Sequence, residues 1–292
     1  MQWTIGDVRV TRVQESLITL PLEALYPEYD PAKLKGHEHW LEPYVANDGT
    51  LGLSTHGLVL ESEGKIILVD TCVGTREVAA VPGMSNQPST FLADLEGIGF
   101  PRDAIDYVVC THLHIDHVGC NTIQDESGAW VPTFPNARYL FSRPDYEYWE
   151  SGAEGAAWTF DSAVKPVYEA DAADLVEMSH VVTSEIQLVP SPGHSPGHVC
   201  VLISSNGEDA VITGDLTHNP VQYIEPNWRM FLDADPELAA RTRREFIARY
   251  ANSGTRIFGS HFPGDSTGFL EIIDGKAQFV PEPTRPSARS TD

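Results

Sequence analysis

The stretch THLHIDHVG, which runs from Thr111 to Gly119, places three histidines and one aspartate within a few residues. Such side chains are costly to bury unless something binds them. The stretch follows YVVC, residues 107–110, a short apolar run typical of a buried strand. The cluster therefore lies at the carboxyl end of a strand, where sites in α/β proteins tend to occur. Imidazole and carboxylate groups suit zinc, iron or manganese, so we expect a metal site here.

The spacing inside this cluster predicts two metal centres. His112 and His114 are two residues apart, so on an extended segment they project from one side. Asp116 and His117 are adjacent, and on a tight turn they can face a second centre nearby. Each centre then needs further ligands from other parts of the chain.

Three further candidates lie at the ends of other predicted strands. His194 follows EIQLV in the loop PSPGHSPGH, Asp215 ends AVITGD, and His261 ends RIFGSH. Seven protein ligands suit two metal ions, with a water or hydroxide completing both coordination shells. We assign His112, His114 and His194 to one ion, and Asp116, His117 and His261 to the other, with Asp215 as the bridge.

Strand and helix patterns alternate along the rest of the chain. Helices are expected at about 89–97, 143–151 and 236–251, and Asp235 is a typical cap for the last of them. This order predicts a layered α/β protein with helices outside a mixed β core. The same helix should place Arg241, Arg243 and Arg244 on a solvated face. Strands are expected at 8–14, 56–62, 65–71, 106–110, 137–142, 185–191, 198–204, 209–215 and 255–261.

The chain is expected to form a single domain over residues 1–292. Two stretches look like irregular extensions, namely 20–55, rich in Pro, Tyr and acidic residues, and 142–180, rich in aromatic and acidic residues. Residues 281–292 form a polar tail.

Charge and composition exclude several classes of partner. The chain has 19 basic and 42 acidic residues, a formal net charge of −23, which disfavours nucleic acids and anionic membranes. No apolar run approaches the ~18 residues of a membrane span, and the N-terminus lacks a secretory pattern. We therefore expect a cytoplasmic protein whose cysteines are reduced and buried. These are Cys72, Cys110, Cys120 and Cys200.

The combined pattern resembles the metallo-β-lactamase superfamily. HxHxDH, the GHSPGH loop, TGD and the strand-end histidine carry this resemblance, which covers about residues 55–265. It implies a four-layered αβ/βα sandwich. It also implies that Asp70, in LVDT, supports the metal ligands from outside the coordination sphere.

Within that superfamily the chain looks closest to the dinuclear hydrolases that include N-acyl-homoserine lactonases and methyl parathion hydrolase. HLHIDHVGCNT, GDLTHNPVQ and SHFPG carry this closer likeness. The lactonases carry a tyrosine shortly after the bridging aspartate, and His218 stands there in this chain. His218 is therefore either a hydrogen-bond donor to the developing oxyanion or a wall of the pocket. His56 and His198 are expected to be strand or loop residues held by hydrogen bonds.

An aromatic group in the second extension has two interpretations. It forms either ordinary packing or an apolar cap for a hydrophobic acyl or aryl group. The residues are Tyr146, Trp149, Trp158 and Phe160.

These features predict a metal-dependent, lactonase- or esterase-like hydrolase. A hydroxide bridging two divalent ions would attack a carboxylic ester or lactone of a small hydrophobic molecule, with Asp116 steering the hydroxide. Zinc is the expected metal, with manganese, iron and cobalt as alternatives. A small-molecule phosphotriester or phosphodiester hydrolase is the alternative enzyme, and a non-catalytic metal-binding protein is the alternative of another class. A homodimer, with 20–55 as an arm, is a further expectation.

Overall fold

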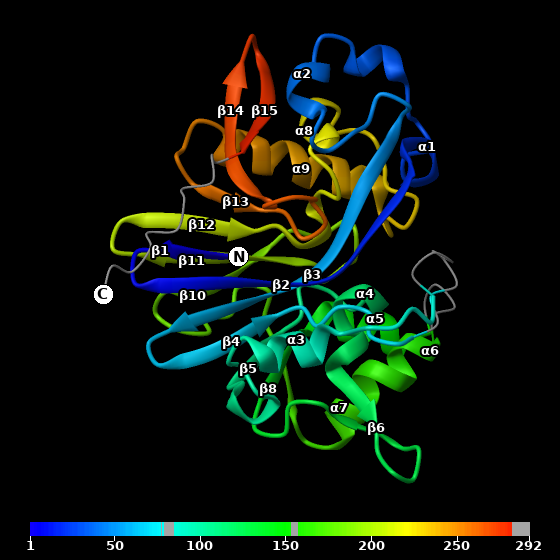
Figure 1. Cartoon of the computed structure of the whole chain (residues 1–292), viewed down its shortest axis with the longest axis vertical. Helices are drawn as coiled ribbons and strands as arrows, with labels where there is room; N and C mark the ends of the chain where they lie inside the picture. Colours follow the sequence, from blue (N-terminus) through cyan, green and yellow to red (C-terminus); the bar gives the residue numbers. More distant parts are fainter. Residues whose placement is uncertain (77, 79–84, 153–156, 282–292) are drawn as a thin grey trace.

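Two stacked β-sheets form the centre of the computed structural model, which describes residues 1–76, 78, 85–152 and 157–281 (Figure 1). The first sheet contains, in spatial order, β1 (Gln2–Ile5), β2 (Val8–Pro21), β3 (Thr50–Ser62), β4 (Lys65–Val69), β5 (Tyr107–Val109), β8 (Arg138–Ser142) and β9 (Ala173–Val176). The second contains β10 (Ile186–Pro190), β11 (Val199–Ser205), β12 (Glu208–Ile212), β13 (Arg256–Phe258), β14 (Thr267–Ile273) and β15 (Lys276–Pro281). A separate small ribbon pairs β6 (Thr122–Gln124) with β7 (Trp130–Pro132).

Alternating side chains explain why the two sheets pack face to face. In β3, Leu58 and Leu60 join the core between the sheets, while Val59 joins the cluster on the other face. In β12, Ile212 points between the sheets and Val211 points away. Successive strand residues face opposite sides, so apolar residues at every position bury both faces of each sheet.

Helices cover the outer faces of both sheets. On the first sheet, α3 (Phe91–Gly97), α5 (Arg143–Glu150) and α7 (Lys165–Glu169) contribute buried side chains to the outer cluster. On the second sheet, α9 (Pro236–Tyr250) packs Phe246 and Tyr250. The four-layered α/β sandwich and the three helices predicted from the sequence are confirmed.

The segment 142–180 is more regular than expected. It contains α5, α6 (Ala157–Thr159), a π-helical turn (Phe160–Val164), α7 and the edge strand β9. These pieces are short, and a helix of one or two turns leaves too little periodicity to distinguish it from a loop.

The segment 20–55 continues β2 and leads into β3, with α1 (Leu22–Leu25), η1 (Pro31–Leu34) and α2 (Glu38–Leu41) between them. Its apolar side chains pack against α8 (Val221–Ile224) and Trp228 of the same chain. The remaining short helices are η3 (Arg102–Ala104), α4 (Ile115–Val118), η4 (Gly119–Asn121) and η7 (Gly214–Leu216).

Of the predicted polar tail, only Pro281 belongs to the described residues, and it ends β15. The rest of the tail lies outside them. Within the described ranges, no helix has the length and hydropathy needed to cross a membrane. All four cysteines are buried and unpaired, as expected.

Parallel strands bring several loops to one edge of the sandwich. β4, β5, β8 and β9 run parallel in the first sheet, and β12 and β13 run parallel in the second. Since parallel strands end on the same side, the loops that follow them meet there.

Candidate metal centre

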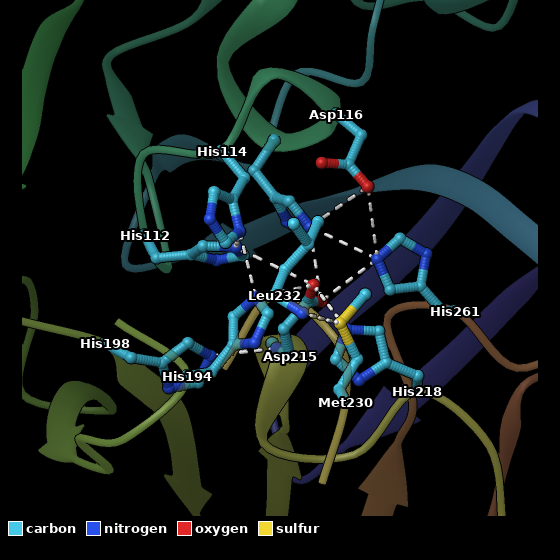
Figure 2. A network of polar contacts seen from close by, with 12 residues as sticks. His112, His114, Asp116, His194, His198, Asp215, His218, Met230, Leu232 and His261 are labelled. Atoms are coloured by element: carbon cyan, nitrogen blue, oxygen red, sulfur yellow. Dashed lines mark hydrogen bonds and ion pairs between the residues drawn. The ribbon is translucent and has the colours of Figure 1, made fainter. Parts of the chain in front are cut away.

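The loops at this edge bring together all seven predicted metal ligands. Figure 2 labels all of them except His117. Two residues precede α4, two lie on it, and the others follow β10, β12 and β13. They form two groups, and the ligand atoms of each group all lie within 4.8 Å of one another. The first group is His112, His114, His194 and Asp215, and the second is Asp116, His117, Asp215 and His261.

The carboxylate of Asp215 lies between the two groups. Its Oδ1 is 3.2 Å from Nε2 of His117 and 3.0 Å from Nε2 of His261. Its Oδ2 is 3.6 Å from Nε2 of His112 and 3.3 Å from Nε2 of His194. One oxygen therefore faces each group, as expected for a carboxylate that bridges two cations.

In three histidines, Nδ1 is the outer nitrogen, which points away from the site, and Nε2 is the inner nitrogen, which points into it. The hydrogen bond made by Nδ1 determines whether Nε2 bears a lone pair. Each outer Nδ1 lies next to a carboxylate or carbonyl oxygen, which can only accept a hydrogen bond, so Nδ1 carries the hydrogen. In a neutral imidazole, the inner Nε2 is then an unprotonated ligand atom. The pairs are His117 with Asp70 (2.8 Å), His194 with Asp233 (3.0 Å), and His261 with the carbonyl oxygen of Ser54 (2.8 Å).

These residues fit a divalent metal. Nε2 of His117 and Nε2 of His261 are 3.2 Å apart, and both bear lone pairs in the neutral rings. Among the described residues, Oδ1 of Asp215 has no hydrogen-bond partner, although it is buried. Lone pairs that converge in this way repel one another unless a cation lies between them, and imidazole with carboxylate is a typical set for zinc. The geometry therefore supports a divalent metal site.

Asp70 takes the supporting position that the sequence resemblance implied. Its carboxylate contacts Nδ1 of His117 and accepts hydrogen bonds from the backbone N–H of Thr111 (2.8 Å) and from its hydroxyl (2.9 Å). Asp70 also adopts a left-handed conformation with φ of 58°. A non-glycine residue rarely adopts this conformation, and it occurs here at a functional turn.

His198 plays a structural part that its sequence position did not reveal. The backbone N–H of Asp215 donates a hydrogen bond to its Nε2 (2.8 Å), and its Nδ1 lies 2.8 Å from the hydroxyl of Ser191. Burial lowers the pKa of His198 to about 3, so the ring is a neutral acceptor. Gly214 allows this approach, because its φ is +52° and an added Cβ would lie 2.5 Å from Nε2. The expected hydrogen-bonded role of His198 is confirmed, and that role fixes the turn that carries Asp215.

Asp233 and Arg243 lie next to a predicted ligand, and the sequence reasoning placed neither of them at the site. Asp233 contacts Nδ1 of His194 and accepts a hydrogen bond from the backbone of Met230 (2.9 Å). Its Oδ2 lies 3.4 Å from Nη1 of Arg243, whose side chain is fully buried. The prediction of a solvated Arg243 was therefore wrong, because this face of α9 packs against the loop that carries Asp233. The neighbours Arg241 and Arg244 are exposed.

His218 lies directly beside the carboxylate of Asp215. Its Nε2 is 3.0 Å from Oδ2 of Asp215, and its ring stacks on the ring of His261, with the two centroids 5.5 Å apart. Within the described part of the chain, Nδ1 of His218 has no hydrogen-bond partner, although the ring is buried. Such a nitrogen is available to a bound molecule.

The structure brings together three of the four predicted pocket residues. Tyr146, Trp149 and Phe160 line a cavity of about 330 Å³, to which none of the seven predicted ligands contributes. The ring of Trp149 also packs against that of His114, with centroids 5.3 Å apart. Trp158 does not line this cavity and is 42% exposed.

The fold and the two His/Asp groups define a metallo-hydrolase with an αβ/βα sandwich. The family model described as the metallo-beta-lactamase superfamily matches residues 51–261, and the chain belongs to that superfamily.

Relatives and solved structures extend the comparison. An N-acyl homoserine lactonase, AiiA of Bacillus thuringiensis subsp. kurstaki, is 27% identical over 204 residues, which cover 65% of this chain and 73% of the relative. AidC, described as a dizinc quorum-quenching lactonase, superposes with a TM-score of 0.81 at 21% identity, covering 98% of both chains. The hydrolase AbOPH superposes with the same TM-score of 0.81, also at 21% identity and 98% of both chains. At this identity, the solved structures establish the fold.

Proposed function

We propose that the protein is a dinuclear metal-dependent hydrolase that cleaves a carboxylic ester or lactone of a small hydrophobic molecule. The position of Asp215, with one oxygen toward each group, is the observation that carries the proposal. The likeness to a relative named as an N-acyl homoserine lactonase favours the lactone. The first group would hold one ion and the second the other, and zinc is favoured by the donor atoms and by the dizinc description of AidC.

Divalent ions held there would supply Lewis acidity, which lowers the pKa of water and polarises a carbonyl oxygen. Asp116 is the most accessible of the seven side chains, at 20% exposure, and its Oδ2 is 3.5 Å from Nε2 of His261. We assign to Asp116 the role of orienting the attacking water, because its side chain is the most exposed of the seven ligands. The rings of Tyr146, Trp149 and Phe160 in the cavity beside Trp149 would receive the apolar part of the substrate. Trp158, which does not line this cavity, remains a proposed cap residue at its rim.

The hydrolytic activity should depend on bound metal, and its kcat/KM should differ among substrate classes. A chelator is expected to abolish hydrolysis, and added zinc, manganese or cobalt to restore it. Among an acyl-homoserine lactone, an aryl ester, a phosphotriester and a β-lactam, the lactone and the ester should show the highest kcat/KM. A phosphotriester at the top would favour the alternative enzyme, and hydrolysis that survives complete metal removal would contradict both.

His218→Phe is expected to lower kcat by about 10²-fold with little change in KM or metal content, since phenylalanine keeps the ring shape but removes both nitrogens. Steady-state kinetics on the best substrate, with metal analysis of the same samples, checks this. His39→Phe, at an exposed histidine of α2, is the control. An unchanged kcat would make His218 only a wall of the pocket.

A further inference from the structure

A buried carboxylate on α5 joins two loops that carry predicted ligands. Asp145 is fully buried. Its Oδ2 accepts a hydrogen bond from the backbone N–H of Leu113 (2.9 Å), and its Oδ1 accepts one from the backbone N–H of Gly197 (2.9 Å). Leu113 lies between two histidines of the first group, and Gly197 lies in the loop that carries His194. One side chain therefore contacts the backbone of both loops.

The second loop packs against α5 so closely that only glycine fits. An added Cβ on Gly197 would lie 2.2 Å from the hydroxyl oxygen of Ser142 and 2.3 Å from the backbone nitrogen of Asp145. That hydroxyl donates a hydrogen bond to the carbonyl oxygen of Gly197 (2.5 Å). The backbone N–H and the carbonyl group of Gly197 are therefore both hydrogen-bonded to side chains at the start of α5. This explains the second glycine of GHSPGH.

The chemistry of Asp145 indicates a role beyond packing. No lysine or arginine of the described residues forms an ion pair with it. Burial raises the pKa of its carboxyl group, and the two backbone amides, together with the nearby Ser195 and His114, oppose that shift. A buried carboxylate without a lysine or arginine partner is costly, and an apolar residue would fill the same space without that cost. A carboxylate offers two acceptor oxygens, whereas asparagine offers one and would turn its NH₂ group toward an N–H donor.

We infer that Asp145 is a positioning residue, which sets the separation of the two loops so that His112, His114 and His194 meet at the first metal. The second group depends on α4 and on the loop after β13, and Asp145 contacts neither by hydrogen bonds. Loss of Asp145 should therefore weaken one metal position selectively. This inference rests on the proposed two-metal function.

Zinc binding to metal-depleted protein tests the inference. Wild-type protein should bind two equivalents, and chelator competition should resolve their affinities. Asp145→Asn is expected to weaken one of them by about 10–100-fold and to leave the other unchanged. Anomalous scattering from zinc in crystals at limiting metal should show which group has lost occupancy, and we expect the first. Glu147→Gln, at an exposed position of the same helix, is the matched control and should bind like wild type.

A second variant covers the case in which Asp145→Asn does not fold. Ser142→Ala removes the other contact to Gly197 and should weaken the same metal position by a smaller factor, with thermal unfolding of the metal-depleted protein reporting on the fold. Equal weakening of both positions, or no change in a folded variant, would overturn the inference alone. A wild-type protein that binds no zinc would overturn the proposed function together with this inference.

Discussion

Asp215→Ala is expected to lower kcat/KM by at least about 10³-fold, equivalent to about 4 kcal/mol of transition-state stabilisation. The substitution removes the one side chain that belongs to both ligand groups. It also leaves the inner nitrogens of His117 and His261 facing each other without the carboxylate between them. Metal analysis should therefore show less than two bound equivalents, and kinetics on the best substrate should show the loss.

Asp209→Ala provides the control, since Asp209 is an exposed aspartate on β12, the strand that leads to Asp215. Its activity and metal content should match those of wild type. Circular dichroism and the unfolding midpoint of both variants separate a lost site from a lost fold. A folded Asp215→Ala protein with near wild-type activity would exclude Asp215 as the bridge.

Asp233→Ala is expected to reduce the free energy of unfolding by about 3–5 kcal/mol, because it leaves the buried guanidinium of Arg243 without its carboxylate. Urea denaturation of the metal-depleted protein measures this effect without a contribution from bound zinc. Arg241→Ala, at an exposed arginine of the same helix, should change the free energy of unfolding by little.

A double variant separates the two roles of Asp233. Asp233→Leu combined with Arg243→Met replaces the ion pair with apolar side chains, and such replacements often restore stability. Zinc affinity should nevertheless stay about 10–100-fold weaker than in wild type, because Nδ1 of His194 still lacks its acceptor. Recovery of zinc affinity together with stability would show that Asp233 acts only through the fold.

The predicted ligands could be found from sequence because their geometry is local. The spacing of His112, His114, Asp116 and His117 is a property of one strand end and one turn. Asp215 and His261 were found because parallel strands end at one edge, so a polar residue after each strand indicates a shared site. The strand patterns with helices between them predicted a layered α/β protein, and the resemblance to the superfamily implied its four-layered sandwich.

The partners that hold the ligands could not be found in this way. Asp233 is 39 residues from His194 along the chain, in a loop without any periodic pattern. Arg243 was misplaced because an arginine on an amphipathic helix is ordinarily solvated, and only the tertiary structure shows the carboxylate that faces it. Asp145 lies in the first turn of a helix, where an aspartate has a sufficient local explanation.

The candidate centre draws its side chains from both sheets, since α4 follows β5 of the first sheet and the other loops follow β10, β12 and β13 of the second. Cations bound there would add to the apolar contacts and hydrogen bonds that already connect the two halves near that edge. Any species that binds the native state and not the unfolded chain adds its binding free energy to the native state. The supply of transition metal in the surroundings would then govern how long each molecule survives heat and proteases, as well as how fast it turns over substrate.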